Sequence, residues 1–305
     1  MRKGSVIWLV TTYNYFMWIL FALGAAVLTS FNPILYKQIL KDADPLTVVW
    51  GVMLLALPFL ILFTIALTPQ LPQLDGWFAL GVIGSAGLNS MAHLASTKAL
   101  KLADVSLVTP LLIFSPVFTV LISAIFLGEV PSAGAVLGVG FILIGGYWLN
   151  RGSGAGWLTP FKSIRLKPGV AFILFAGLLW AITPLFEKVA IQHTNPESPR
   201  FAALVAITLL VIFLTPLVVS RGRSALEKLT LHRKPLFVAS LIAATAPLLG
   251  YSAFSLGLVG IVTTLFKLSA LMTVIWSALF LKEQGLRQRL PACGLMIIGA
   301  ILIAL

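Results

Sequence analysis

The sequence has few charged residues and a single cysteine, and each shortage excludes a class of protein. Charged residues make up 10% of the 305 positions, against about 25% in soluble domains. With 59% apolar residues and a mean hydropathy of +1.04, the chain is neither a soluble globular protein nor an intrinsically disordered one. Cys293 alone cannot form an internal disulfide framework or a cysteine metal cage.

Acidic residues are also scarce, which leaves a formal net charge of +12. In a soluble protein that excess of charge would favour a nucleic-acid partner. Here the lysines and arginines collect between hydrophobic runs, where membrane topology explains them better. We therefore expect a lipid bilayer as the environment and no nucleic acid as a partner.

Ten apolar runs separated by charged or proline-rich breaks fill the rest of the chain. The runs are Phe16–Leu35, Pro45–Leu67, Gly76–Thr97, Ser106–Leu127, Ala133–Leu149, Gly169–Ile191, Phe201–Val219, Leu236–Gly257, Val259–Leu281 and Leu290–Leu305. A span of the bilayer core takes about 20 residues and must satisfy its own backbone hydrogen bonds. Since none of the runs shows the period-two alternation of a barrel strand, the sequence predicts an all-α protein with ten transmembrane helices.

The ten runs form two halves of five, joined by a basic, glycine-containing linker over residues 150–168. The halves are predicted to cover residues 16–149 and 169–305. Residues 1–15 begin with Arg2-Lys3 and a short apolar run, like a signal peptide, but no small-residue cleavage site follows. We expect a retained interfacial lead-in there, with a cleaved segment as the alternative.

The two halves are sequence repeats. A shift of 154 residues places Ala99–Glu129 on Ala253–Glu283 without a gap, and a slightly different shift aligns the proline and lysine of Asn32–Lys37 with those of Thr183–Lys188. Because five is odd, the two halves must cross the membrane in opposite senses. Such inverted-topology repeats are typical of secondary transporters, whose binding site lies near the midplane between the halves. Duplication for packing alone is the other interpretation.

The end of the repeated segment carries a motif that resembles a known family. Phe126–Pro131 (Phe-Leu-Gly-Glu-Val-Pro), preceded by Thr109–Pro116, is similar to the end of an EamA domain. The second copy, Phe280–Glu283, departs from the pattern by having Lys282 in place of glycine and no proline nearby. Two such domains make a ten-helix member of the drug/metabolite transporter superfamily. The resemblance implies transport of amino acids, sugar phosphates, nucleotide sugars or other metabolites through a central cavity, with the fifth helix of each half at the periphery.

Polar residues recur at four-residue spacing in the third apolar run. Ser85, Asn89, His93 and Thr97 lie on one face of a helix. A polar stripe is costly against lipid, so this face should meet a cavity or another helix. Interhelical hydrogen bonding suits Ser85 and Thr97, whereas Asn89 and His93 are predicted to line a substrate cavity.

Lys267 is the most informative single residue, because it lies eight residues into the ninth apolar run. A lysine at the centre of a span costs about 2.5–3.5 kcal/mol on insertion scales. Its counterpart in the other repeat is Ile113, so folding does not require a charge at this position. We expect Lys267 to bind substrate, with Thr263 one turn earlier on the same face. The alternative is a lysine that reaches outward or pairs with a carboxylate.

Four further residues are candidate substrate contacts. Asn32 and Thr183 each precede a proline late in the opening helix of a half, where the missing backbone hydrogen bond loosens the helix. Trp180 and Tyr251 could stack on a substrate, although aromatic residues in membrane helices more often pack against one another. Proline kinks too are common in any bundle, so these assignments have structural alternatives.

Carboxylates and metal ligands are missing from the centres of the runs. The nearest carboxylate is Glu187, late in the sixth run, so coupling through a deep carboxylate has no obvious candidate. A metal site is not expected, because no second histidine or carboxylate lies at ligand spacing, and no cofactor is expected. Since Lys267 would repel a cation, an anionic or zwitterionic substrate fits better.

These observations predict a secondary transporter that moves a small polar metabolite by alternating access. A channel or receptor-like membrane protein is the alternative. An intramembrane enzyme is disfavoured, because only His93 and Lys267 offer titratable chemistry at depth and no paired motif surrounds them. No Walker motif is present, so this chain alone is not an ATP-driven pump. The small-residue segments Gly134–Gly138 and Gly294–Gly299 predict close helix contacts, either within the chain or in a homodimer.

The distribution of lysine and arginine predicts the orientation in a cell membrane. One side of the ten-helix arrangement holds 16 of these residues and the other side, with both termini, holds four. The positive-inside rule then places both termini outside the cell. The family resemblance implies the reverse, with both termini in the cytoplasm.

Overall fold

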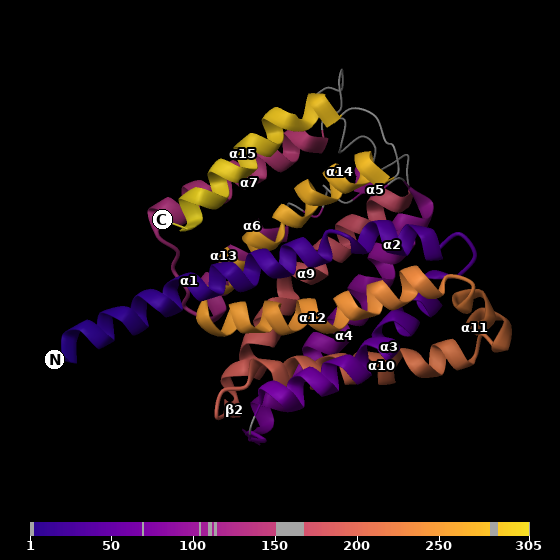
Figure 1. Ribbon diagram of the computed structural model, residues 1–305, viewed down its shortest axis with the longest axis horizontal. Helices are drawn as coiled ribbons and strands as arrows, with labels where there is room; N and C mark the ends of the chain where they lie inside the picture. Colours follow the sequence, from indigo (N-terminus) through magenta and orange to yellow (C-terminus); the bar gives the residue numbers. More distant parts are fainter. Residues whose placement is uncertain are drawn as a thin grey trace.

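The computed structural model describes residues 3–68, 70–103, 105–108, 112, 115–150, 168–280 and 286–304, and it is almost entirely helical (Figure 1). The first half contains α1 (Lys3–Thr29), α2 (Asn32–Ile39), α3 (Pro45–Leu67), α4 (Gly76–Leu102), α5 (Val105–Val108), α6 (Ser115–Phe126) and α7 (Ala133–Asn150). The second half contains α9 (Pro168–Gln192), α10 (Pro199–Val219), α11 (Arg223–Thr230), α12 (Arg233–Leu256), α13 (Val259–Phe266), α14 (Leu268–Phe280) and α15 (Leu286–Ala304). Two short strands, β1 (Gln73–Leu74) and β2 (Thr194–Asn195), pair antiparallel between the halves.

Six helical segments are long and apolar enough to cross a membrane. They are Phe16–Ile39, Pro45–Leu67, Gly76–Leu102, Pro168–Gln192, Pro199–Val219 and Arg233–Leu256. The other four predicted spans contain α5 with α6, α7, α13 with α14, and α15. The all-α membrane fold is thus confirmed, whereas the count of ten spans is not confirmed and stays a prediction for these four.

Helix starts follow from local sequence. Asp44 caps α3 by accepting hydrogen bonds from the Leu46 and Thr47 amides, at 3.1 and 3.3 Å, and Pro45 occupies the first helical position. Asp75 caps α4 through the Phe78 amide at 3.0 Å. Acceptor side chains before a helix satisfy amides that have no partner within it, and proline costs no hydrogen bond there.

The opening helix of each half behaves differently around its proline. In the first half, α1 ends at Thr29 and α2 begins at Asn32, next to Pro33. The break is stabilised from the second half: Thr273 donates to the Ser30 carbonyl at 2.8 Å. Pro184 instead lies inside a continuous α9. The predicted loosening is therefore seen only in the first half.

The predicted ninth span is two helices rather than one. α13 ends at Phe266, α14 begins at Leu268, and Lys267 stands between them with its amide bonded to the Thr264 carbonyl at 3.0 Å. At the N-terminus, the described part of the predicted lead-in belongs to α1, which is continuous from Lys3 to Thr29.

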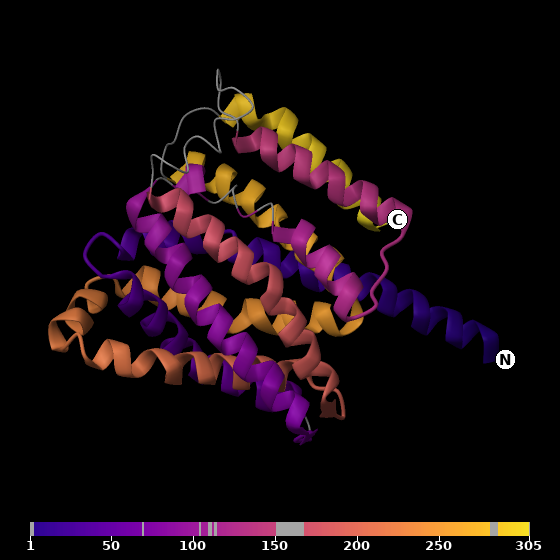
Figure 2. The same cartoon turned by 180° about the vertical axis from the view of Figure 1, so that it is seen from behind.

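Contacts between the halves come in reciprocal pairs. In the repeat, α12 corresponds to α4 and α1 corresponds to α9. Helix α4 lies along α9, and in the same way α12 lies along α1 (Figures 1 and 2). Helix α12 contacts α3 and, correspondingly, α4 contacts α10, while α3 packs on α10 and α7 on α15. A two-fold relation between the halves generates this reciprocity. An axis in the membrane plane and an axis along the membrane normal both produce such reciprocity, so the inverted topology and the superposition of the halves remain predictions.

Small residues allow the closest helix contacts. A β-carbon added to Gly81 in α4 would lie 2.7 Å from the Ala190 amide nitrogen in α9, and one added to Gly299 in α15 would lie 2.6 Å from the Gly138 carbonyl in α7. Helices α7 and α15 lie side by side at one edge of the bundle, at the top of Figures 1 and 2. Gly138 and Gly299 therefore pack against each other within the chain, and a homodimer stays a prediction.

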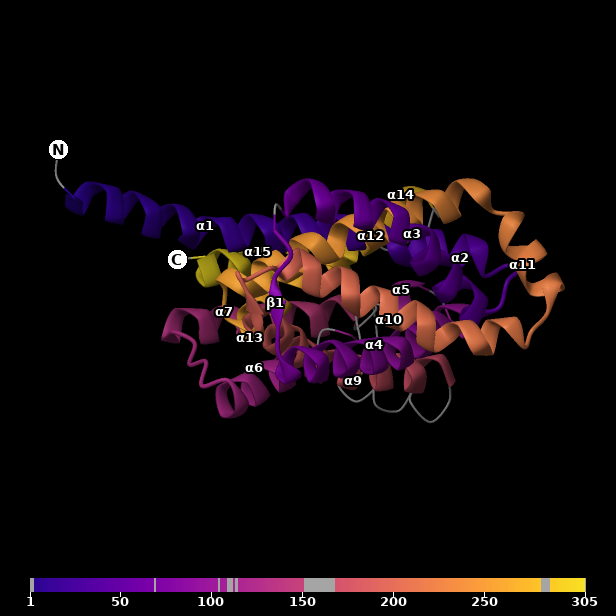
Figure 3. The same cartoon turned by 90° about the horizontal axis from the view of Figure 1, so that it is seen from below.

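The elongated molecule has two different ends (Figure 3). The chain termini lie toward one end and α11 lies at the other. We call these the terminal end and the α11 end. The segment 221–234 at the α11 end exposes basic side chains. Lys188, which the count of lysine and arginine assigned to the terminal side, is instead buried in α9. The count on that side therefore falls from four to three.

Candidate functional site

A cavity of about 340 Å³ lies between the two halves, in the centre of the bundle. Its wall is built by α1 to α4 of the first half and by α9, α10, α12, α13 and α14 of the second. All eight side chains predicted as substrate contacts line it: Asn32, Asn89, His93, Trp180, Thr183, Tyr251, Thr263 and Lys267. Residues that are distant in the sequence thus meet at one cavity.

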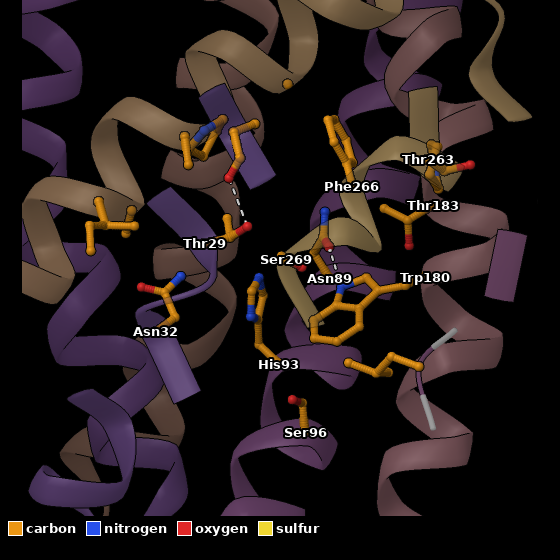
Figure 4. Close-up of a pocket in the computed structure, with 18 of the residues that line it drawn as sticks. Thr29, Asn32, Asn89, His93, Ser96, Trp180, Thr183, Thr263, Phe266 and Ser269 are labelled. Atoms are coloured by element: carbon orange, nitrogen blue, oxygen red, sulfur yellow. Dashed lines mark hydrogen bonds between the residues drawn. The ribbon is translucent and has the colours of Figure 1, made fainter. Parts of the chain in front are cut away.

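The polar stripe of α4 faces this cavity. Asn89, His93 and Thr97 line it, while Ser85 is buried behind Asn89. Figure 4 shows the His93 ring between Asn32 and Trp180. The His93 and Trp180 rings meet edge to face, with centroids 5.3 Å apart and planes at 79°. This arrangement holds the imidazole against an aromatic wall.

A hydrogen-bond network joins three of the surrounding helices. The Asn89 side-chain oxygen accepts from Trp180 Nε1 at 3.0 Å (Figure 4), and the Asn89 amide donates to Glu187 Oε1, also at 3.0 Å. Ser85 Oγ lies 3.4 Å from the same carboxylate oxygen and 3.2 Å from the Tyr251 hydroxyl. The network therefore connects α4, α9 and α12 through one carboxylate.

Glu187 is the functional candidate that sequence reasoning missed. From the sequence, coupling through a deep carboxylate has no obvious candidate, but in the structure the Glu187 side chain is 8% exposed and lines the cavity. A signal was present, because Trp180, Thr183 and Glu187 recur at three- and four-residue spacing on one helix face. Asn89 and Ser85 both reach the Oε1 atom of Glu187, and the Tyr251 hydroxyl also interacts with this carboxylate, so all of its partners in the described part of the chain are neutral.

Lys267 brings an ammonium group to the cavity wall. Within the described residues, no side chain or carbonyl forms a hydrogen bond or ion pair with its ammonium group. Thr263 and Thr183, by contrast, donate their hydroxyl protons to the Gly260 and Leu179 carbonyls of their own helices, both at 2.9 Å. These two threonines can therefore only accept hydrogen bonds from a ligand, whereas Lys267 can donate three.

Asn32 adds an unsatisfied acceptor at the break between α1 and α2. Its Oδ1 atom is buried and has no hydrogen-bond partner in the described part of the protein. Apolar and aromatic groups complete the wall, among them Met53, Tyr251 and Phe266. The described residues contain no group of three histidine, cysteine or carboxylate side chains placed to hold a metal ion. The cavity thus offers one carboxylate, one ammonium group and aromatic surfaces.

The motif glutamate Glu129 lies outside the cavity and connects the halves. It follows α6, and its Oε2 accepts a hydrogen bond from the Val259 amide at 2.6 Å, at the start of α13. Partial burial raises the pKa of Glu129 above its ordinary value. The second-copy residue Glu283 lies outside the described residues. In the first copy, therefore, this motif residue has a structural contact.

Comparisons with known proteins agree with this architecture. The model of the EamA-like transporter family matches residues 16–151 and 167–305. No curated protein matched the sequence. A solved structure described only as "Crystal structure of protein" superposes with a TM-score of 0.68 at 18% identity, covering 94% of this chain and 98% of its own, and it shows the fold alone. Because the family model covers both halves, the chain belongs to the EamA-like transporter family.

Proposed function

We propose that this protein is a secondary transporter that carries a small zwitterionic metabolite across the cell membrane. One observation supports this most directly: the same central cavity is lined by the free ammonium group of Lys267 and by the carboxylate of Glu187. Glu187 is bonded only to neutral donors among the described residues. Each charge is therefore available to an opposite charge on a ligand.

Electrostatics favours a zwitterion over a singly charged substrate. In a low-dielectric cavity an uncompensated charge costs several kcal/mol, far more than in water. A cation would compensate the charge of Glu187 but would be repelled by Lys267. An anion would compensate Lys267 but would be repelled by Glu187. A ligand with both an ammonium and a carboxylate group compensates both wall charges. Of the anionic and zwitterionic substrates expected from the sequence, we therefore propose the zwitterion.

The size and wall chemistry of the cavity fit a small molecule with an apolar part. A volume of about 340 Å³ is at the lower end of the roughly 300–1,000 Å³ typical of ligand sites. The Trp180 indole is held by Asn89, and Tyr251 is held through Ser85, so both rings are fixed surfaces against which an apolar group can pack. The polar groups would orient the ligand and the rings would exclude water.

Alternating access is the mechanism that this architecture supports. The cavity lies between two repeats whose contacts are reciprocal, which is the arrangement in which one repeat rocks against the other around a central site. A channel would need a continuous path through the protein.

A matched set of ligands tests the function. Purified protein is first screened by thermal shift against the standard amino acids, their decarboxylated amines and their deaminated acids, such as leucine, isopentylamine and 4-methylpentanoate. Bound ligands raise the apparent stability of the folded state. We expect at least one amino acid to stabilise the protein at concentrations at which its amine and acid do not.

Uptake of that amino acid into proteoliposomes then tests transport. We expect saturable uptake and faster exchange when unlabelled amino acid is present inside. Stabilisation only by anions or only by amines would contradict the zwitterion assignment. A non-saturating current would instead support a channel.

A further inference from the structure

A lysine of α2 binds the end of a neighbouring helix. Lys37 Nζ donates hydrogen bonds to the carbonyl oxygens of Leu100 and Ala103, both at 2.7 Å. These carbonyls belong to the last turn of α4 and the residue that follows it, where no helix amide is left to bind them. A cation at a helix C-terminus also interacts favourably with the helix dipole.

The second half repeats this contact with equivalent residues. Lys188 Nζ in α9 donates to the carbonyl oxygens of Phe254 and Gly257, the latter at 3.3 Å, at the end of α12. The lysine stands 151 residues after Lys37, and both carbonyls stand 154 residues after those that Lys37 binds. These are the two shifts that align the repeats. The two contacts are therefore counterparts.

The two lysine contacts lie at opposite ends of the cavity. Helix α4 ends toward the α11 end of the molecule, whereas α12 begins after α11 and ends toward the terminal end (Figure 1). Both contacts adjoin the cavity wall: Tyr36 and Leu100 line it beside the Lys37 contact, and Glu187 and Phe254 line it beside the Lys188 contact.

Each lysine also joins two different packing units. Helix α4 lies along α9, and α12 lies along α1. An Asp–His contact holds each unit together at its end: Asp75 Oδ2 and His193 Nδ1 are 2.7 Å apart beside α4 and α9, and Asp42 Oδ2 and His232 Nε2 are 2.7 Å apart beside α2 and α12. Lys37 and Lys188, by contrast, bridge from one unit to the other.

We propose that Lys37 and Lys188 are the two gate residues of the transporter, one for each face of the membrane. Separating the α4–α9 unit from the α1–α2–α12 unit at one end requires breaking that end's lysine–carbonyl bonds, while the other lysine keeps the opposite end closed. In this structure both contacts are formed. The inference rests on the alternating access proposed above and assigns its gates to particular residues.

Face-specific labelling tests the gates. Cys293→Ser removes the native cysteine, and Ser269→Cys places a reporter in the cavity wall, where the Ser269 side chain makes no hydrogen bond to a described residue. A membrane-impermeant maleimide is applied to sealed vesicles of each orientation. We expect Lys37→Met to raise the labelling rate about tenfold or more from the α11 side only, and Lys188→Met to do so from the terminal side only. Losing hydrogen bonds to a charged group supports a change of this size.

Three controls make the outcome decisive. Lys98→Met removes a lysine of α4 whose ammonium lies over the Phe172 ring of α9, 4.3 Å from its centroid, and so stays within one unit. It should not alter labelling. Lys37→Arg and Lys188→Arg should restore wild-type rates, because arginine can also donate to two carbonyls.

Unchanged labelling in both methionine variants would overturn the gate assignment, and so would an equal rise from both faces. Uptake measured on the parent protein separates the two proposals. If uptake is saturable but neither methionine variant changes labelling from one face only, the gate assignment is wrong and the proposed transport stands. If uptake shows neither exchange nor saturation, alternating access itself is wrong.

Discussion

Replacing Lys267 with methionine separates charge recognition from folding. Methionine keeps most of the side-chain length and removes the ammonium group. No described residue depends on that ammonium for a hydrogen bond, so the change leaves no protein group unpaired. An unpaired lysine at the centre of a span costs about 2.5–3.5 kcal/mol on insertion scales. We therefore expect the melting temperature of Lys267→Met to equal or exceed that of the wild type.

The loss of affinity should depend on the ligand's carboxylate. A hydrogen bond to a charged group contributes about 1.5–3 kcal/mol, which corresponds to a 10- to 150-fold change in Kd. We expect this loss for the amino acid that the thermal-shift screen identifies. Its decarboxylated amine has no group for Lys267 to bind and should bind Lys267→Met at least as well as it binds the wild type, because the repulsion between like charges is gone.

Isothermal titration of wild type and variant with the amino acid and its amine measures both effects. Lys228→Met is the matched control, since Lys228 is exposed on α11 and its loss should leave both affinities unchanged. Equal affinity of Lys267→Met and wild type for the amino acid would refute the reasoning. An equal loss for the amino acid and the amine would do the same, because it would show a structural role for the lysine.

Two further predictions follow from particular contacts, and a third follows from the distribution of lysine and arginine. Asn89→Leu leaves Trp180 Nε1 and the Glu187 carboxylate without their shared partner. The free energy of unfolding should therefore fall by about 2–4 kcal/mol, and the melting temperature should fall with it. An unchanged melting temperature would contradict the hydrogen-bond network. Gly81→Leu should abolish correct folding, because the new β-carbon would lie 2.7 Å from the Ala190 amide nitrogen. Size-exclusion chromatography would show this as aggregation. Gly87→Ala is the control and should be tolerated, because its β-carbon meets no atom within 4 Å. The lysine and arginine count places the C-terminus outside the cytoplasm, so a C-terminal alkaline phosphatase fusion expressed in a bacterium should be active. Fluorescence of a C-terminal fluorescent-protein fusion in the cytoplasm would contradict this orientation.

The polar stripe of α4 shows what local spacing could predict. Asn89 and His93 share a helix face because the helix repeats every 3.6 residues, and a polar face must avoid lipid wherever it lies in the bundle. Their place in the cavity wall therefore needed no knowledge of their neighbours. Lys267 was predicted to line the cavity by a similar argument, from its depth in a run and its residue type, whereas for Trp180 residue type left packing against other aromatics as an alternative.

Glu187 and Lys188 show where that reasoning stopped. They are adjacent in the sequence, yet one lines the cavity with Asn89 and the other binds the end of α12. Both outcomes depend on α9 packing between α4 and α12, which no local pattern specifies. The position of Glu187 within its apolar run did not predict that it lines the cavity, because the hydrogen-bond donors that accommodate its carboxylate come from another helix.

The sequence by itself determined the membrane environment, the helical class, the two repeats and the polar faces. These follow from the composition of single segments and from the requirement that each segment satisfies its own backbone in lipid. Only the tertiary structure decided which helices lie together, where a helix breaks and which charges meet. Those outcomes depend on close packing between segments far apart in the chain, such as Gly81 against Ala190, and on hydrogen-bond partners supplied from the other half.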